Sequence, residues 1–349
     1  MVAKSQSRLL LVSAIVVGFV ILCLLLYFLI LRQLREVKRH QLVELKSVFT
    51  TSDTLENFLG FINDVWLDEG AGKLYALDRK TNCIAVFDTS LDFLYRIGRA
   101  GHAGNEFASP MWIRSRDSII YVSDFGHGRL KLLRSDGGYM GDLPLSVYQL
   151  LYPFAVDHSG CIVANAPFDA DSLLVVYDTA GRIVRQFGQR VKQPAERQTL
   201  RRNLVWPVVG EDGSIYVVFE SLPYIRKYSK DFQLLGEKDV TSATELRWTF
   251  RRLKENEKRN PQAIHSMLGG VYYRRPYLYV NYGTDLPHGA TLFAYDANTL
   301  ELREATVANI SAHSWDSVRV VGSFVILPGS RNVVSFDMNT GRLVKYAVR

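Results

Sequence analysis

The chain has 349 residues and a net charge of +7. Hydrophobic residues make up 48% of it and charged residues 22%. This is the composition of a globular protein and excludes a disordered chain. This length allows one large domain or two ordinary ones. Its three cysteines, Cys23, Cys83 and Cys161, are too few and too scattered for a disulfide framework. No Cys-x-x-Cys or Cys/His spacing indicates zinc, so we expect no metal site and no cofactor.

An uncharged apolar segment, Leu9 to Leu31, follows a short N-terminal tail of residues 1–8. At about 1.5 Å per residue, its 23 residues match a hydrocarbon core of about 30 Å. A cleaved signal peptide has an apolar region of about 7–15 residues that ends in small residues, whereas this segment is longer and runs into Leu-Arg-Gln-Leu-Arg35. The sequence therefore predicts a single-pass transmembrane helix at residues 9–31, which contacts the membrane through Leu9 to Leu31.

Residues 32–58 are expected to form a juxtamembrane helix or linker, and within them Leu45 to Phe49 can be either an added strand or part of the linker. Arg32 to Lys46 contains no Gly or Pro and can continue the membrane helix. Two basic residues precede the apolar segment and four follow it closely: Lys4 and Arg8, then Arg32, Arg35, Lys38 and Arg39. The positive-inside rule would place the large C-terminal part in the cytoplasm, but the margin is small and long domains can be translocated regardless. The side of the membrane on which the large C-terminal part lies stays open.

Beyond residue 59 a short strand pattern recurs six times. The six cores are Leu74-Tyr75-Ala-Leu-Asp78, Ile120-Tyr121-Val-Ser-Asp124, Cys161-Ile162-Val-Ala-Asn165, Ile215-Tyr216-Val-Val-Phe219, Leu278-Tyr279-Val-Asn281 and Phe324-Val325-Ile-Leu327. Their spacings of 46, 41, 54, 63 and 46 residues are near the period of a β-propeller blade. The pattern predicts an all-β fold, a six-bladed β-propeller over residues 59–349, preceded by the transmembrane helix.

A turn follows the next strand of each unit. These turns open with Phe87-Asp88, Leu133-Arg134, Tyr177-Asp178, Tyr228-Ser229, Tyr295-Asp296 and Phe336-Asp337. An Asp side chain that accepts hydrogen bonds from its own backbone, followed by Gly, is favourable turn chemistry. A calcium-binding role for these aspartates is the weaker interpretation.

The stretch IGRAGHAGNEFASP, Ile97 to Pro110, has three glycines spaced three residues apart, at positions 98, 101 and 104. A phosphate-binding loop would open a helix, but here Met-Trp-Ile113 and the strand-like Ile119-Ile-Tyr-Val122 follow. Together with the strand core and the Phe-Gly-His-Gly-Arg129 run, the stretch resembles the NHL repeat, whose glycine-spaced loop and F-x-x-P lead into a YV-x-D core. The resemblance implies a connector between blades, with Phe107 and Pro110 fixing its path, and a propeller that leans toward an extracytoplasmic location.

Two basic insertions, residues 189–203 and 241–264, explain the two long spacings. They carry net charges of +4 and +3, and residues 1–40 carry +5, so the rest of the chain has −5. In the second insertion, Ser242 and Glu245 predict a capping box, and Leu246, Phe250 and Leu253 predict an apolar helix face. Both insertions are expected on one rim of the propeller, with the binding residues Arg190, Lys192, Arg197, Arg201, Arg202, Arg247, Trp248, Arg251, Lys254 and Lys258.

This rim predicts a partner-binding surface. A protein partner, a polyanion such as RNA or anionic headgroups would all suit its charge, and Trp206 and Trp248 could stack on bases. A solvated helix face is the alternative.

Catalytic groups of propeller enzymes surround the axis. By position, the weak axial candidates are Asn63, Asp64, Arg114, His265, Asp316 and Arg319. Neither a G-x-S-x-G nor an H-E-x-x-H motif occurs, and the histidines fall at different positions within their units. We therefore expect a binding or scaffolding module, a subunit or accessory of a membrane-associated assembly. A membrane-tethered hydrolase or lyase with an axial site, and a polyanion or RNA binder, are the alternatives.

Overall fold

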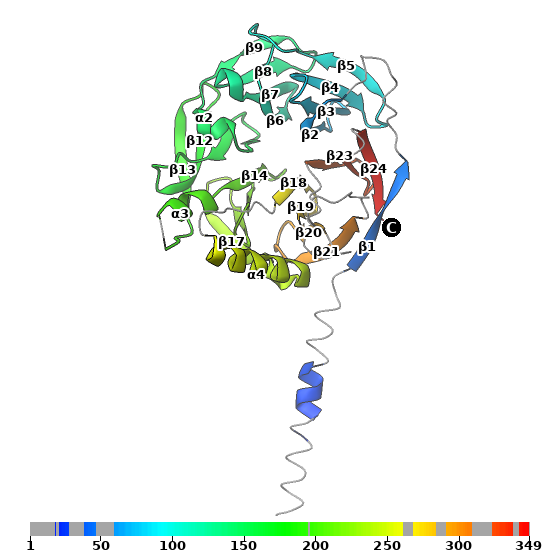
Figure 1. Ribbon diagram of the computed structural model, residues 1–349, viewed down its shortest axis with the longest axis vertical. Coiled ribbons are helices and arrows are strands. Elements are labelled where there is room, and N and C mark those ends of the chain that lie inside the picture. The colour runs from blue at the N-terminus through cyan, green and yellow to red at the C-terminus, as the bar shows by residue number, and fades with distance from the viewer. Residues whose placement is uncertain are drawn as a thin grey trace, which may run out of the picture. The chain divides into compact units, whose positions relative to one another are not determined.

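The computed structural model describes residues 18, 21–27, 38–46, 59–194, 196–260, 268–283, 291–308, 323–337 and 342–348. Residues 39–349 form one compact unit, a six-bladed β-propeller (Figure 1). Each blade has four strands, and every strand pair that lies within one blade is antiparallel. The predicted all-β propeller is confirmed.

The first four blades follow the chain order, and each is a separate four-stranded sheet. Blade one has β2 (Ile62–Asp68), β3 (Lys73–Asp78), β4 (Cys83–Asp88) and β5 (Phe93–Ile97). Blade two has β6 (Pro110–Arg116), β7 (Ile119–Asp124), β8 (Arg129–Arg134) and β9 (Tyr139–Leu143). Blade three has β10 (Ala155–Val156), β11 (Ile162–Asn165), β12 (Ser172–Tyr177) and β13 (Ile183–Gln189). Blade four has β14 (Val205–Val209), β15 (Ile215–Phe219), β16 (Tyr224–Tyr228) and β17 (Leu234–Asp239).

The last two blades share one eight-stranded sheet. Blade five has β18 (Leu268–Arg274), β19 (Tyr277–Tyr282), β20 (Leu292–Asp296) and β21 (Leu302–Ala308). Blade six has β22 (Phe324–Ile326), β23 (Val333–Asp337), β24 (Arg342–Val348) and, as its outermost strand, β1 (Lys38–Lys46) from the N-terminal part of the chain. Strand β1 lies between β24 and β21 in the strand order, so it connects the outer edges of both blades.

The innermost strands close the ring. Strand β22 contacts both β18 of blade five and β2 of blade one, and the other first strands contact their neighbours in turn. The strands near the axis are buried on both faces because each blade packs between two others, as the burial of Tyr75, Val122 and Val217 shows. The first strand of each blade runs from the side of the inter-blade connectors (the connector face) to the side of the first hairpin turns (the turn face).

Two expectations need correction at the ring closure. Residues 38–46 form strand β1, where a helix continuing from the membrane segment was expected, because their backbone pairs with β24 through Leu42↔Val348 and Val43↔Ala347. The sixth strand core, Phe324 to Leu327, is the first strand of its blade rather than the second. Ser323 Oγ accepts a hydrogen bond from Val65 N just as Asp64 accepts one from Ile113 N, which fixes its innermost position.

The glycine-rich stretch after β5 is an inter-blade connector, as predicted. Phe107 is 1% exposed and pairs with Ala100 across a short bridge. Gly98 has φ +75°, and a Cβ there would meet the Phe107 ring at 2.3 Å, so this position requires Gly. The carboxylates that end β3 and β7 hold the connectors, since Asp78 accepts from Gly60 N and Phe61 N and Asp124 accepts from Ala108 N.

The turn role of the recurring polar residues is also confirmed. Asp88, Asp178, Ser229 and Asp296 each accept backbone N–H groups two to four residues further on. Gly137 and Gly181 adopt φ +90° and +77° in two of these turns. Asp337 ends β23 and does not open a turn after a third strand. Among the described residues, no group of His, Cys, Asp or Glu side chains has the arrangement of a metal site.

Short helices lie between the strands: η1 (Phe125–His127), α2 (Val147–Leu150), α3 (Glu196–Arg202), η2 (Val240–Ser242) and α4 (Thr244–Arg259). The predicted helix of the second insertion is confirmed as α4, which buries Leu246 and Phe250, the latter against Tyr282 of blade five. Its predicted capping box is wrong, because Ser242 belongs to η2 and the N-cap is Ala243. A capping box occurs instead at α2, between Ser146 and Gln149.

The predicted membrane segment lies mostly outside the described residues. Residues 18 and 21–27 are helical, and the side chains from Ile21 to Tyr27 that are large and apolar are at least half exposed. Within the described part of the chain, no helix is long and apolar enough to cross a membrane.

Candidate functional site

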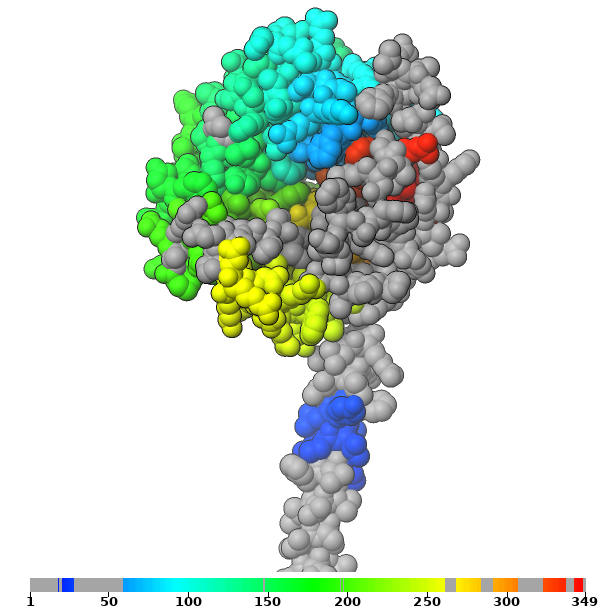
Figure 2. All heavy atoms as spheres, viewed as in Figure 1, coloured from blue at the N-terminus to red at the C-terminus, as the bar shows by residue number. Residues whose placement is uncertain are grey.

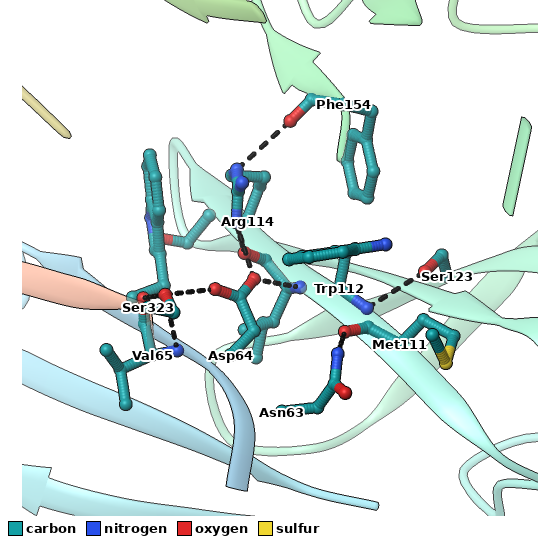
Figure 3. A network of polar contacts seen from close by, with 12 residues as sticks. Asn63, Asp64, Val65, Met111, Trp112, Arg114, Ser123, Phe154 and Ser323 are labelled. Atoms are coloured by element: carbon teal, nitrogen blue, oxygen red, sulfur yellow. Dashed lines mark hydrogen bonds and ion pairs between the residues drawn. The ribbon is translucent and has the colours of Figure 1, made fainter. Parts of the chain in front are cut away.

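A buried polar network joins four blades close to the axis (Figure 3). Asp64 on β2 accepts from Arg114 Nη1 at 2.6 Å and from Ile113 N at 3.0 Å through Oδ2, and from Ser323 Oγ at 2.5 Å through Oδ1. Arg114 Nε donates to Phe154 O at 3.0 Å. Four successive blades, six, one, two and three, thus meet at this ion pair.

The network accounts for three of the predicted axial residues. The side chains of Arg114 and Asp64 are only 5% and 2% exposed, and the guanidinium also lies 4.6 Å from the centre of the Trp66 ring. Asn63 Nδ2 donates to Met111 O at 2.6 Å. Hydrogen bonds inside the protein therefore occupy these polar groups, which is how a buried charged pair is retained in a fold. His265, Asp316 and Arg319 lie outside the described residues.

A cavity of about 560 Å³ lies beside this network, against the turn-face ends of five first strands, β2, β6, β10, β14 and β18. Its volume falls within the range of about 300–1,000 Å³ that is typical of small-molecule sites. Three aromatic residues are among those that line it: Trp66 from blade one and Tyr272 and Tyr273 from blade five. Trp66 and Tyr272 meet edge to face at 6.1 Å, and Tyr273 stacks on Tyr216 at 5.3 Å. The rings are thus held in fixed positions by their neighbours.

Two arginines enter the cavity from opposite blades of the ring, Arg116 from blade two and Arg274 from blade five. Arg116 Nη1 lies 3.3 Å from His158 Nδ1, while the buried Nε of Arg116 has no hydrogen-bond partner among the described residues. Arg274 Nη1 donates to Ile326 O at 3.0 Å. Both guanidinium groups therefore give the cavity wall positively charged hydrogen-bond donors.

Among the other polar side chains that line the cavity are a histidine, a tyrosine phenol and four carboxylates. His158 Nε2 lies 3.0 Å from Gly210 O, a pure acceptor, so this nitrogen carries the proton and Nδ1 accepts from Arg116. Burial raises the pKa of Tyr272 well above its usual range, which keeps the phenol neutral, and its OH lies 3.5 Å from Glu69 Oε1. The carboxylates that line the cavity are Asp68 at the end of β2 and, from the turns, Glu69, Asp117 and Glu211. The cavity therefore has cationic and aromatic walls and an acidic turn region.

Sequence reasoning did not find Arg116, Tyr272, Tyr273 or Arg274. The sequence does contain a pattern that points to the two arginines, because in blades two and five an Arg ends the first strand just before its hairpin turn. Reading it requires knowing that these two blades face one another across the ring, which is a property of the closed fold.

The predicted basic rim is only partly available for binding. Arg190 donates to Ser172 O and to three carbonyls of residues 166–168, so it fastens the second-to-third strand loop of blade three. Arg202 on α3 forms a salt bridge with Glu257 on α4, which joins the two insertions. Trp206 is 8% exposed and packs edge to face on Trp112 at 5.1 Å, so the expected base stacking by Trp206 is wrong.

The outer side of α4 carries the rest of the rim. Arg247, Trp248, Arg251, Lys254 and Lys258 are exposed, as is Lys192 before α3, and Arg201 is half-buried. Trp248 is 50% exposed, and α4 (yellow) lies at the edge of the molecule in Figure 2. The side chain of Arg197 lies outside the described residues. We call Lys192, Arg201, Arg247, Trp248, Arg251, Lys254 and Lys258 the α3–α4 surface.

The comparisons with known proteins agree with the fold. No protein-family model matches the chain, and no curated protein matches it. Among solved structures, a candidate exported protein from Bacteroides fragilis aligns with a TM-score of 0.53 and 12% identity over 89% of this chain and 94% of that one. A streptogramin B lyase aligns with a TM-score of 0.48 and 13% identity over 89% of this chain and 98% of that one. A virginiamycin B lyase from Staphylococcus aureus aligns with a TM-score of 0.48 and 10% identity over 89% of each chain.

At such identities the likeness shows the fold alone, and the two lyase alignments carry no argument about activity. What the fold and these comparisons define is a six-bladed β-propeller.

Proposed function

We propose that this protein is a membrane-anchored, NHL-like propeller that binds a small anionic ligand in its axial cavity. The observation that carries the proposal is the pair of guanidinium groups, Arg116 and Arg274, which line a cavity large enough for a small molecule from opposite blades. Arg274 on the opposite wall supplies a second guanidinium, and guanidinium groups bind carboxylates and phosphates in a fixed geometry. The aromatic walls suit an apolar part of the same ligand.

Binding is better supported than catalysis. The axial pair Asp64 and Arg114 is occupied by internal hydrogen bonds. Ser115 Oγ accepts from Trp66 Nε1 at 3.1 Å, and both ring nitrogens of His158 are engaged. Neither Ser115 nor His158 therefore has the arrangement of an activated nucleophile or general base.

The anchor belongs to the same proposal. The 23 uncharged residues from Leu9 to Leu31 are long enough to span a bilayer, and the six residues 32–37 separate them from β1. The anchor would tether the propeller to a membrane. We place the propeller on the extracytoplasmic side.

The cavity is tested with the purified full chain in detergent, by thermal-shift screening of small carboxylates and phosphates. We expect at least one to raise the melting temperature, and Arg116→Gln to weaken its binding about tenfold or more, because a charge-assisted hydrogen bond is lost. Arg134→Gln is the matched control, since Arg134 is 60% exposed in a turn of the same blade and pairs with Asp136. Equal binding by both variants, or no stabilising compound in the panel, would contradict the proposal.

The anchor is tested separately. The full chain should stay in the membrane fraction after alkaline carbonate extraction, and protease should degrade a C-terminal tag from outside the cell. Release by carbonate contradicts the anchor, and a protected tag contradicts the sidedness.

A further inference from the structure

We propose that the α3–α4 surface is a docking site for an acidic segment of a partner protein, on the face of the propeller opposite the axial cavity. This surface is separate from the cavity and adds a second binding function to it. Only the step that sets lipid aside rests on the proposed anchor.

The first step is the division of α4 into two faces. Leu246, Thr249 and Phe250 are buried against the propeller, so the helix is held by its apolar side. Arg247, Arg251, Lys254 and Lys258 then share the outward side at spacings of three and four residues. The Arg202–Glu257 salt bridge joins α3 to this helix and brings Lys192 and Arg201 into one surface.

The second step is the separation of charge. The two insertions carry +4 and +3, whereas the chain outside them and outside residues 1–40 carries −5. A basic area on an otherwise acidic body attracts an acidic partner and turns it toward this area during encounter. The surface thus selects for acidic ligands.

The third step is the position of the surface relative to the N-terminal strand. Helices α3 and α4 connect outer strands to the next first strands and therefore belong to the connector face. Strand β1 begins at the turn face, because it is antiparallel to β24 and its Leu42 pairs with Val348 at the end of that strand. The chain thus enters the propeller at the face opposite this surface, and we take a protein rather than lipid headgroups as the partner.

The fourth step distinguishes protein from nucleic acid. Single-stranded nucleic acids bind on platforms of successive exposed aromatic rings. Trp206 is buried against Trp112, so Trp248 is the exposed ring of this surface, with Glu255 on the same side of the helix. One large aromatic anchor surrounded by charged residues is the arrangement typical of a protein-binding hot spot.

The experiment uses the full chain with Trp248→p-benzoylphenylalanine, photo-cross-linked in the cells that produce it. We expect an adduct with one protein, mapped by mass spectrometry to a segment rich in Asp and Glu. Charge reversal by Arg251→Glu, Lys254→Glu and Lys258→Glu should reduce the adduct about tenfold, because attraction becomes repulsion. Reversal at Arg134, Arg182 and Lys230, exposed residues of three turns, should leave it unchanged.

Four outcomes would overturn the proposal: an adduct with lipid mass, an adduct with RNA, no adduct, or a protein adduct that both sets of charge reversals affect equally. Circular dichroism and melting temperature of the charge-reversed chains check that they are folded. The thermal-shift result with Arg116→Gln and the carbonate extraction report on the cavity and the anchor separately. A failure of the docking proposal is therefore distinguishable from a failure of the cavity or of the anchor.

Discussion

Asp64 shows how one side chain can determine the assembly of several blades. Its two carboxylate oxygens receive hydrogen bonds from blades two and six, and its ion-pair partner Arg114 continues the network to Phe154 in blade three. The sequence identified both residues as axial, but it could not show that they satisfy one another. A buried ion pair at the axis can be catalytic or structural, and only the list of its partners distinguishes the two roles.

The first prediction concerns this pair. Asp64→Ala should lower the free energy of unfolding by about 3–5 kcal/mol, because it leaves the buried Arg114 guanidinium without its counter-charge. Chemical denaturation of the full chain in detergent measures this change. The double variant Asp64→Ala with Arg114→Met should recover a large part of the loss. Additive effects of the two substitutions would show that the pair is not coupled.

The second prediction concerns Asp124, which ends β7 and accepts from Ala108 N at 2.8 Å and His127 Nδ1 at 2.6 Å. Burial raises the pKa of Asp124 above 3.8, although His127 and Lys131 oppose this. The folded state then binds the proton more tightly than the unfolded state. The stability of the wild type relative to Asp124→Asn should therefore fall as the pH rises through the window from about 3.8 to the folded-state pKa.

The control for Asp124 is Asp136, an exposed turn residue. The backbone N–H of Gly138 and the Arg134 guanidinium lower the pKa of Asp136. The stabilisation that ionised Asp136 contributes is present above its unfolded-state pKa and is lost as the pH falls. The stability of the wild type relative to Asp136→Asn should therefore rise with pH, opposite to the change at Asp124. Denaturation series between pH 3 and 6 measure both. A slope of the same sign at both positions would contradict the assignment.

Among the elements, strand β1 pairs with a strand that is far from it in the sequence. It comes from the N-terminal part of the chain and completes a blade built from the C-terminal part. The sequence predicted a helix or linker at residues 32–58, with an added strand only at Leu45 to Phe49 as an alternative, because Arg32 to Lys46 has no helix breaker and its strand partner is some 300 residues away. Local propensity is a weak prior, and here pairing with an available strand edge overrides it.

The third prediction follows from that position. Val43→Pro should destabilise the propeller by about 3 kcal/mol, because β1 lies between two strands and a proline there removes a ladder hydrogen bond. Hydrogen exchange should increase in β24 and in β21 together. Val43→Thr, which keeps the backbone N–H and the β-branched shape, is the matched control. Faster exchange confined to residues 38–46 would show that β1 is not needed for closure.

For the whole molecule, the main feature is that the two proposed binding regions lie on different faces. The axial cavity opens among the first hairpin turns, and the α3–α4 surface lies on the side of the inter-blade connectors. Because every first strand runs from one face to the other, insertions in the connectors can change one face without disturbing the other. The small ligand and the partner protein that we propose would therefore not compete for one face.

The sequence by itself determined the six-fold repeat, the turn chemistry, the connector at Ile97 to Pro110, the helix of the second insertion and the segregation of positive charge. All of these depend on residues close together in the chain, where periodicity, capping and turn preferences act. The tertiary structure decided which polar residues meet at the axis, which arginines face one another across the cavity, and which strand closes the ring. Those contacts join residues from different blades, whose distances are set by the closed ring and leave no local pattern in the chain.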